Sequence, residues 1–414
     1  MKKYLKYSLY VLAISAFYCC SNDDDAKREP VIEEPKPEPV KEAVVSIKLG
    51  ADFVVEKYNA VEIDPEVVIE NANGAVAQYK WSIKVTGNDG AVKDSVIGDT
   101  KILLFIAPKA NNYDVNLTVT LDKLVKQAST KVAVSETGKT YTSKALSLVD
   151  YVPAPAYNIE ADSFISKTEL LEQRQLDLTE GTEIPLGTFG GYIVTKFDHT
   201  VINVYGKRDF IVQMLANSAS VKYTPVSVYV AYDANKNGVA DGNEWYEIAG
   251  SEYHKSTTVK NYEVTYFKPD PAKAAVAGTK DWQFDKEYLK YTDNKNASAF
   301  ITRTAKNKRR IYYPEWQGDS YTLKGTKLYL PSKDVSDGAG TNFNVGTFEW
   351  GYGGIKDPSI DISWAVDSEG NKVLLPGIDF VKVYVSTFVE MGASDLLVSY
   401  FKQAEDLNFS AAAK

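Results

Sequence analysis

The sequence predicts a mainly β protein made of two β domains. Between residues 43 and 150, short apolar segments are separated by turn signals such as Asn73-Gly74, a spacing that favours an immunoglobulin-like sandwich of about a hundred residues. Apolar and polar residues alternate strictly in Tyr113–Thr120, so one face of this segment is expected to be buried. Residues 158–414 follow as one larger all-β domain.

The pattern of the first domain predicts six strands, at residues 44–49, 67–70, 78–85, 102–106, 113–121 and 131–135. In the second domain only residues 164–175 and the segment after Glu244 have a helical pattern. Trp350 and Trp364 are expected to lie within strands and in the core. Residues 151–157, with two prolines in a short apolar stretch, are predicted to link the two domains.

Residues 1–20 have the pattern of a secretory signal. Lysines at positions 2, 3 and 6 precede an apolar run that is too short to span a membrane, and the run ends at Cys19-Cys20. A cysteine in this place resembles the lipobox of bacterial lipoproteins. We expect lipidation at Cys20, with Cys19 as the alternative, because the acidic residues 21–25 resemble the export signal of Bacteroidetes surface lipoproteins. A cleaved, soluble precursor is the other interpretation.

Residues 21–42 are rich in Asp, Glu, Lys and Pro and are predicted to be an extended tether. Both cysteines of the chain lie in the signal segment, so the mature domains have neither disulfides nor thiolate chemistry. Removing the signal takes away three lysines and moves the formal charge from −8 to about −11. This acidity argues against nucleic acid as a partner.

A calcium-binding loop is predicted at Asp233–Glu244, which satisfies the pattern D-x-[DN]-x-[DN]-G-x5-E. Calcium prefers oxygen ligands, and the expected donors are Asp233, Asn235, Asn237, the carbonyl of Val239, Asp241 and both carboxylate oxygens of Glu244. Alternation from Val226 to Val230 indicates that a strand enters the loop, which favours a structural calcium. The alternative is a turn without metal, since Asp, Asn and Gly also favour turns.

An enzyme would have to work with two histidines and no cysteine nucleophile. His199 lies in an apolar strand pattern and is predicted to be structural, and His254 is placed to end a segment. Of the carboxylates that a hydrolase would need, Asp361, Asp367 and Glu369, the last two fall in a predicted hairpin turn at 367–371. We therefore predict no catalytic residue and no enzymatic activity.

Aromatic residues beside cations, placed on loops, are common ligand contacts. Two segments of the second domain have this composition, and they supply the predicted ligand-binding residues Trp282, Arg309, Arg310, Tyr312, Tyr313 and Trp316. Aromatic rings can stack on sugar or corrin faces. The ligand expected from this set is a glycan or another small molecule.

Trp81 in Tyr79–Ile83, followed by the strand at 113–119, resembles PKD-like domains of bacterial surface proteins. The second domain resembles an uncharacterised family of Bacteroidetes cell-surface lipoproteins through the order of five phrases: Leu186–His199, Glu244–Tyr253, Asn261–Tyr266, Phe348–Tyr352 and Leu375–Tyr384. The resemblance implies a jelly-roll-like sandwich.

What this family implies is an anchored protein at the outer-membrane surface that captures a glycan or a corrinoid, beside an outer-membrane transporter. The alternatives are a structural or adhesive protein whose partner is another protein and, less favoured, a glycan-active hydrolase.

Overall fold

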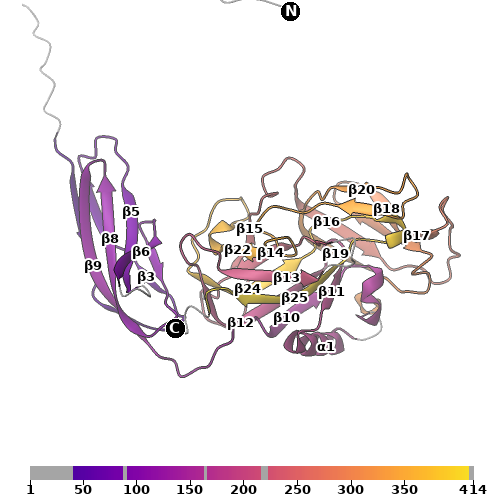
Figure 1. Ribbon diagram of the computed structural model, residues 1–414, viewed down its shortest axis with the longest axis horizontal. Coiled ribbons are helices and arrows are strands. Elements are labelled where there is room, and N and C mark those ends of the chain that lie inside the picture. Colours follow the sequence, from indigo (N-terminus) through magenta and orange to yellow (C-terminus); the bar gives the residue numbers. More distant parts are fainter. Residues whose placement is uncertain (1–40, 87–90, 163–165, 216–221, 410–414) are drawn as a thin grey trace, which may run out of the picture. The chain divides into compact units, whose positions relative to one another are not determined.

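The computed structural model describes residues 41–86, 91–162, 166–215 and 222–409. In these ranges the chain is mainly β, which confirms the predicted fold class (Figure 1). The signal segment, both cysteines and nearly all of the expected tether lie outside the described residues. No helix within these ranges is long and apolar enough to cross a membrane.

The N-terminal sandwich has one five-stranded sheet, in the order β2-β9-β8-β5-β6, and two small sheets, β1-β4 and β3-β7. All three sheets contribute to one buried core. The strands are β1 (Val44–Lys48), β2 (Phe53–Glu56), β3 (Val61–Ile63), β4 (Glu66–Glu70), β5 (Gln78–Thr86), β6 (Val92–Gly98), β7 (Leu103–Phe105), β8 (Asn111–Leu121) and β9 (Leu124–Ser135). The six predicted strands are present, and the pattern missed β2, β3 and β6.

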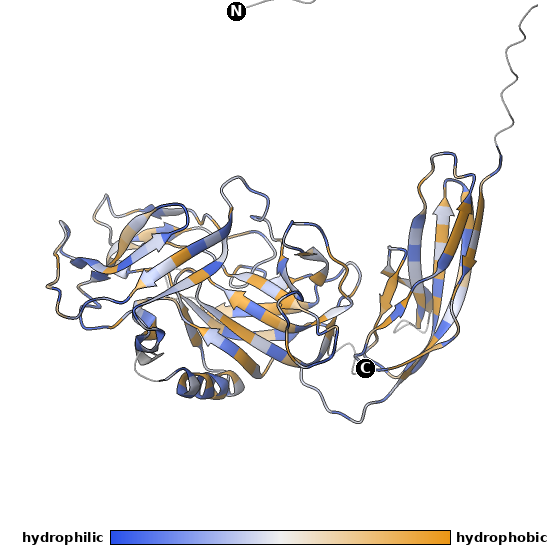
Figure 2. Cartoon of the chain, turned by 180° about the vertical axis from the view of Figure 1, so that it is seen from behind, coloured by the Kyte–Doolittle hydropathy of each residue, from blue (hydrophilic) through white to orange (hydrophobic). Residues whose placement is uncertain are grey.

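The alternation predicted for β8 is confirmed, because Val115, Leu117 and Val119 are fully buried while the intervening residues are not. Hydrophobic and hydrophilic residues alternate along the strands of this sandwich (Figure 2). Trp81 on β5 is also fully buried, and its Nε1 donates to the carbonyl oxygen of Thr100 at 2.9 Å. This satisfies the single polar group of the largest side chain in the core.

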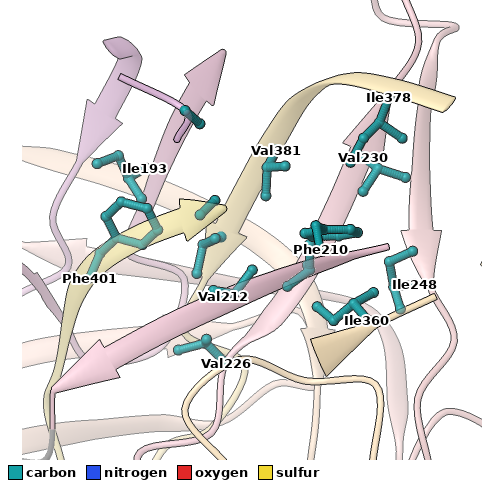
Figure 3. Close-up of a cluster of buried hydrophobic side chains, with 14 of the residues drawn as sticks. Ile193, Phe210, Val212, Val226, Val230, Ile248, Ile360, Ile378, Val381 and Phe401 are labelled. Atoms are coloured by element: carbon teal, nitrogen blue, oxygen red, sulfur yellow. The ribbon is translucent and has the colours of Figure 1, made fainter. Parts of the chain in front are cut away.

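The larger domain is built around a second sandwich. A six-stranded sheet in the order β10-β12-β24-β14-β15-β23 packs against a four-stranded sheet, β11-β25-β13-β22. The strands are β10 (Ser147–Val152), β11 (Ile184–Gly187), β12 (Tyr192–Ile202), β13 (Phe210–Leu215), β14 (Ser227–Ala231), β15 (Trp245–Ile248), β22 (Ser359–Ile360), β23 (Ala365–Val366), β24 (Gly377–Tyr384) and β25 (Ser399–Asp406). Side chains from both sheets, such as Val381 and Phe210, meet in the core between them (Figure 3).

A third sheet, in the order β18-β17-β16-β19, has its own core rich in tyrosine. Its strands are β16 (Val259–Phe267), β17 (Gln283–Asp293), β18 (Ser298–Thr304) and β19 (Ser320–Lys327), and the short pair β20 (Ser332–Asp334) and β21 (Phe343–Val345) follows. The third sheet adds a layer beyond the two of the predicted jelly-roll-like sandwich. It carries most of the predicted ligand-binding residues on its strands and loops.

One α-helix, α1 (Lys167–Glu180), packs against β10 and β11, as Figure 1 shows. It begins with a capping box in which Ser166 and Glu169 each accept from the other's backbone N–H, and this confirms the helix expected at 164–175. In the described ranges there are also four short 3-10 helices: η1 (Tyr157–Asp162), η2 (Glu315–Gln317), η3 (Ile362–Trp364) and η4 (Gly392–Ser394). The helix expected after Glu244 is wrong, because this segment forms β15 and pairs with β14.

The linker expected at 151–157 is also wrong, because this segment is built into the larger domain. Tyr151 lies on β10 and is fully buried, and Ala154 and Ala156 are fully buried as well. The Ala154 N–H donates to the carbonyl of Leu186 at 3.0 Å. Upstream, the Asp406 N–H already donates to the carbonyl of Ser143 at 2.7 Å. The connection between the two β domains is therefore the shorter stretch 136–142.

Candidate functional site

The predicted calcium loop connects β14 to β15, two neighbouring antiparallel strands, so it is a long hairpin loop. The Asp233 N–H donates to Oδ2 of Asp379 on β24 at 2.8 Å, and this contact fixes the start of the loop to the sheet. Lys196 on β12 donates from Nζ to the carbonyl of Gly238 at 2.9 Å. The loop is thus held by two strands besides its own.

Inside the loop, the carboxylates of Glu244 and Asp233 accept hydrogen bonds from backbone N–H groups of the same loop and so connect its two ends. Glu244 is 7% exposed, and its two oxygens accept from the N–H groups of Ala234 at 3.1 Å and Asp241 at 3.0 Å. Asp233 accepts from the N–H groups of Asn237 and Gly238 at 3.0 and 2.8 Å. Gly238 has φ 83°, a conformation that favours glycine, as the pattern requires.

The remaining donors face one another across the loop. The side-chain amides of Asn235 and Asn237 donate to the same Oδ2 of Asp241, at 2.7 and 3.0 Å. In the part of the chain that the structure describes, no three His, Cys, Asp or Glu side chains gather as a metal cluster. A cation here would therefore need the amide oxygens and the Val239 carbonyl in addition to the carboxylates, which is a ligand set suited to calcium.

Trp282 directly precedes β17, at the end of this strand that pairs with the end of β18. Its carbonyl accepts from the Ala305 N–H at 2.8 Å, so the residues after β18 begin directly beside it. The indole Nε1 donates to the carbonyl of Ala339 at 3.0 Å, and a Cβ at Gly340 would lie 3.2 Å from the ring. Trp282 is half-buried and fixed by this neighbouring loop.

The residues that follow β18 form a tight turn that we call the cationic turn, residues 305–310. Asn307 is buried, while Lys306, Lys308, Arg309 and Arg310 are exposed. The turn is closed by the Asn307 N–H donating to Thr304 O at 3.1 Å and the Arg310 N–H donating to Asn307 O at 2.9 Å. These four cations and Ala305 line an open depression of about 410 Å³.

A buried carboxylate on the protein side of the cationic turn holds the turn in place. Asp395 is 4% exposed, and its Oδ2 accepts from Thr304 Oγ1 at 2.9 Å, Asn307 Nδ2 at 3.1 Å and the Tyr312 hydroxyl. Asp395 has φ 70° and ψ −149°, a region that residues other than glycine rarely occupy. The surrounding hydrogen bonds hold it there. Sequence reasoning missed Asp395, since nothing local distinguishes this aspartate.

Two of the predicted ligand contacts are wrong. Tyr312 and Tyr313 are fully buried in the core of the third sheet, although both follow the exposed arginines directly. Burial, with the charge of Asp395 added, raises the pKa of Tyr312 above its usual range. Trp316 is half-buried and packs against the core between the six- and four-stranded sheets and against the core of the third sheet. Trp282, Arg309 and Arg310 remain at the surface.

Beside Trp282 lies a small cavity of about 50 Å³. The cavity is lined by residues of β18 and of the segment around Asp395. They include Thr302, Thr304, Glu390 and Asp395 besides Trp282. The volume suits one or two water molecules rather than a sugar ring. The cavity therefore extends the polar surface beside Trp282 without forming a deep pocket.

His199 is buried, as its apolar strand pattern indicates, and it contacts two carboxylates. It lies on β12 and is 5% exposed, and its ring nitrogens lie 2.8 Å from Asp198 Oδ1 and 3.0 Å from Asp406 Oδ2. Burial alone lowers the pKa of His199, but the hydrogen bonds to Asp406 and Asp198 outweigh this and raise it. The second histidine, His254, lies in an exposed turn after β15.

Two of the three carboxylates considered for hydrolysis, those of Asp361 and Asp367, accept hydrogen bonds from backbone N–H groups a few residues away. Asp367 forms the predicted hairpin turn, in which its N–H donates to the carbonyl of Asn371 at 2.9 Å. Asp361 caps η3 by accepting from the Ser363 N–H at 2.9 Å. Glu369 is exposed in the same turn as Asp367.

A buried glutamate joins the six-stranded sheet to the third sheet. Glu247 on β15 accepts from the Tyr384 hydroxyl at 3.1 Å and from Thr326 Oγ1 at 2.8 Å, and Lys260 Nζ lies 3.7 Å away. Burial raises the pKa of Glu247, and burial lowers the pKa of Lys260 to about 8. Both carboxylate oxygens are engaged by neighbouring strands, so this network is a structural junction.

The expectation that Trp350 and Trp364 lie within strands is wrong. Trp350 lies in a loop and is 38% exposed, and Trp364 is half-buried in η3. Their ring centroids are 4.6 Å apart, and the guanidinium of Arg208 lies 3.9 Å from the centroid of Trp364. Arginine and indole stack favourably in this arrangement. These two tryptophans form a second aromatic surface on the larger domain.

No protein-family model and no curated protein matches the chain. Among solved structures it is similar to the PKD domain of human KIAA0319, with 20% identity over 27% of this chain and 96% of that chain, at a TM-score of 0.19. It is also similar to a quinoprotein alcohol dehydrogenase-like protein of Bacteroides thetaiotaomicron, with 10% identity over 61% and 47% of the two chains, at a TM-score of 0.16.

A third similar structure contains three N-terminal domains of the bacteriophage RB49 outer capsid protein Hoc, with 15% identity, 47% and 48% coverage and a TM-score of 0.16. The chain thus spans nearly all of the PKD domain and about half of each of the other two. TM-scores this low define neither a family nor a function for the chain.

Proposed function

We propose that this protein is a non-enzymatic, surface-anchored lipoprotein that captures a nutrient, a glycan or a cofactor such as a corrinoid, at the outer membrane. In this proposal an outer-membrane transporter receives the ligand. The observation that carries the proposal is the half-buried Trp282 beside the exposed cationic turn, both on the β17–β18 pair. An indole face next to exposed donors is a common arrangement for binding hydroxylated rings.

The side chains of this surface are held in place by hydrogen bonds, which supports a role in ligand binding. The indole N–H of Trp282 is already bonded to Ala339, and the cationic turn is tied to Asp395. A surface that is ordered before the ligand arrives loses little conformational entropy on binding. Of the two carboxylates that line the cavity beside Trp282, Glu390 and Asp395, the second is already engaged by three buried donors, so capture is favoured over hydrolysis.

Calcium is the proposed structural cofactor, bound by the loop Asp233–Glu244. The loop is fixed at Asp379 and Lys196, and its carboxylates already close its two ends. A cation with six to eight oxygen ligands would tighten this hairpin loop between β14 and β15. In this role calcium stabilises the six-stranded sheet and takes no part in ligand chemistry.

Binding of the whole protein to an array of glycans and to cobamides, with calcium present, tests the proposed capture. Trp282→Ala is expected to lower the affinity for the bound ligand by about tenfold, because base or sugar stacking on an aromatic ring contributes about 1–3 kcal/mol. Trp350→Ala is the matched variant. If only Trp350→Ala loses binding, the ligand site lies at the Trp350–Trp364 pair instead. An array and cobamide screen without any bound ligand would contradict capture and favour an adhesive protein.

Lipid anchoring at Cys20 is tested separately. Palmitate labelling is expected to reach the full-length protein and to disappear in Cys20→Ala, because the acylated cysteine carries the lipid. External protease should remove the protein from intact cells. Loss of labelling in Cys19→Ala alone would move the acylated residue to Cys19, and a released, unlabelled protein would rule out the anchor.

A further inference from the structure

The cationic turn has a charge that differs in sign from the protein as a whole. The chain has a formal net charge of −8, yet four cations occur within the five residues 306–310. The one uncharged residue among them, Asn307, turns inward to Asp395, so the exposed residues of 306–310 are all cations.

Two other basic side chains on or beside the same sheet do form ion pairs. Lys324 and Lys273 pair with Glu263 and Glu287, at 2.6 and 3.2 Å. By contrast, among the residues that the structure describes, no ion pair involves Lys306, Lys308 or Arg309. The buried carboxylate that is hydrogen-bonded to the turn, Asp395, is engaged by Thr304, Asn307 and Tyr312. The cationic turn is therefore preorganised, while the charges of Lys306, Lys308 and Arg309 stay available.

From this geometry we infer that the cationic turn binds an acidic polysaccharide, a chain that carries sulfate or uronate groups. The depression at the turn is open, with about 410 Å³ lined by cations and Ala305, and it has no enclosing wall for a single small anion. A polymer with charges along its length can engage several of the cations at once, while Trp282 offers a face to a neighbouring sugar ring. This inference rests on the proposed capture function and specifies its ligand class.

A polysaccharide fits better than other polyanions. Duplex nucleic acid has a dense charge along its whole length and would be repelled by the acidic remainder of the protein. A membrane surface would need a broader basic and apolar face than one turn provides. Sulfate and carboxylate groups both form good hydrogen bonds with arginine and lysine, so the shared chemistry is an anionic oxygen on a sugar.

The inference is tested by the affinity of the whole protein for dextran sulfate, polygalacturonate and neutral dextran. The triple variant Lys306→Gln, Lys308→Gln, Arg309→Gln is expected to bind the two acidic polymers about tenfold more weakly, since each exposed pair contributes about 1.5- to 5-fold. Binding should also weaken as salt rises from about 50 to about 300 mM. The matched control Lys80→Gln, Lys126→Gln, Lys131→Gln removes the same charge from the exposed sheet of the N-terminal sandwich and should leave affinity unchanged.

Three results would overturn the inference: equal binding of dextran and dextran sulfate, equal weakening in the control variant, or binding only to phosphatidylglycerol vesicles or duplex DNA. Its failure is distinguishable from failure of capture as such. If neutral glycans bind, lose affinity in Trp282→Ala, and acidic polymers do not bind, the proposed capture function stands. The acidic polysaccharide is then rejected as the ligand. Absence of any glycan or cobamide ligand would reject both.

Discussion

Asp395→Ala is expected to destabilise the larger domain by about 3 kcal/mol, because it leaves the Leu396 N–H, which donates to Oδ1, and three side-chain donors to Oδ2 without their acceptor. The side-chain donors are Thr304, Asn307 and Tyr312, of which Tyr312 is fully buried. The substitution also removes the desolvation cost of the buried Asp395 carboxylate. The loss of stability is therefore smaller than the summed cost of the unsatisfied donors. The measurement is the midpoint of denaturant unfolding of the larger domain.

The same substitution should loosen the cationic turn before the domain unfolds. Trypsin cleaves after lysine and arginine, so faster cleavage between Lys306 and Arg310 under native conditions reports the loss of the anchor. Tyr312→Phe removes the hydroxyl donor and its hydrogen bond to Asp395 and leaves no donor unsatisfied. It should therefore lower the free energy of unfolding by only about 1 kcal/mol. Equal stability of Asp395→Ala and the parent protein, with unchanged trypsin cleavage, would show that Asp395 does not hold the turn.

Local sequence patterns predicted the elements whose cause is local. The alternation in β8, the helix α1 and the hairpin turn at Asp367–Asn371 each depend on residues within a few positions of one another. Such features can be inferred from one sequence because side-chain period and cap chemistry do not depend on the rest of the fold. The donor pattern of Asp233–Glu244 is local in the same sense.

The candidate binding surface depends on contacts that are distant in sequence. Tyr312 is buried because its hydroxyl bonds to Asp395, 83 residues later, so its proximity to Arg309 and Arg310 gave the wrong exposure. Trp282 and the cationic turn lie side by side only because β17 and β18 pair antiparallel. A proline-rich segment likewise suggested a linker at 151–157, whereas pairing of β10 with β12 places it inside the domain.

Calcium at about 2 mM is expected to stabilise the larger domain by roughly 1.8 kcal/mol if the loop binds with a Kd of about 0.1 mM, by RT ln(1 + [Ca]/Kd). For a domain of this size that corresponds to a rise in Tm of roughly 3–7 °C, measured against protein in chelator. Asp233→Ala should abolish the increment while the protein still folds. Three carboxylates held in one loop repel one another, and the substitution removes part of that repulsion.

Glu244→Gln should abolish the same increment at a larger cost in calcium-free buffer than Asp233→Ala. Glu244 is 7% exposed and ties the two ends of the loop through Ala234 and Asp241, and a glutamine keeps only one of these two acceptors. Asp367→Asn, in a turn with a similar pattern of carboxylate-to-backbone bonds, is the matched control and should keep the full calcium increment. If chelator leaves the parent melting curve unchanged and calorimetry detects no heat with calcium, the loop is a turn closed by its own side chains and binds no metal.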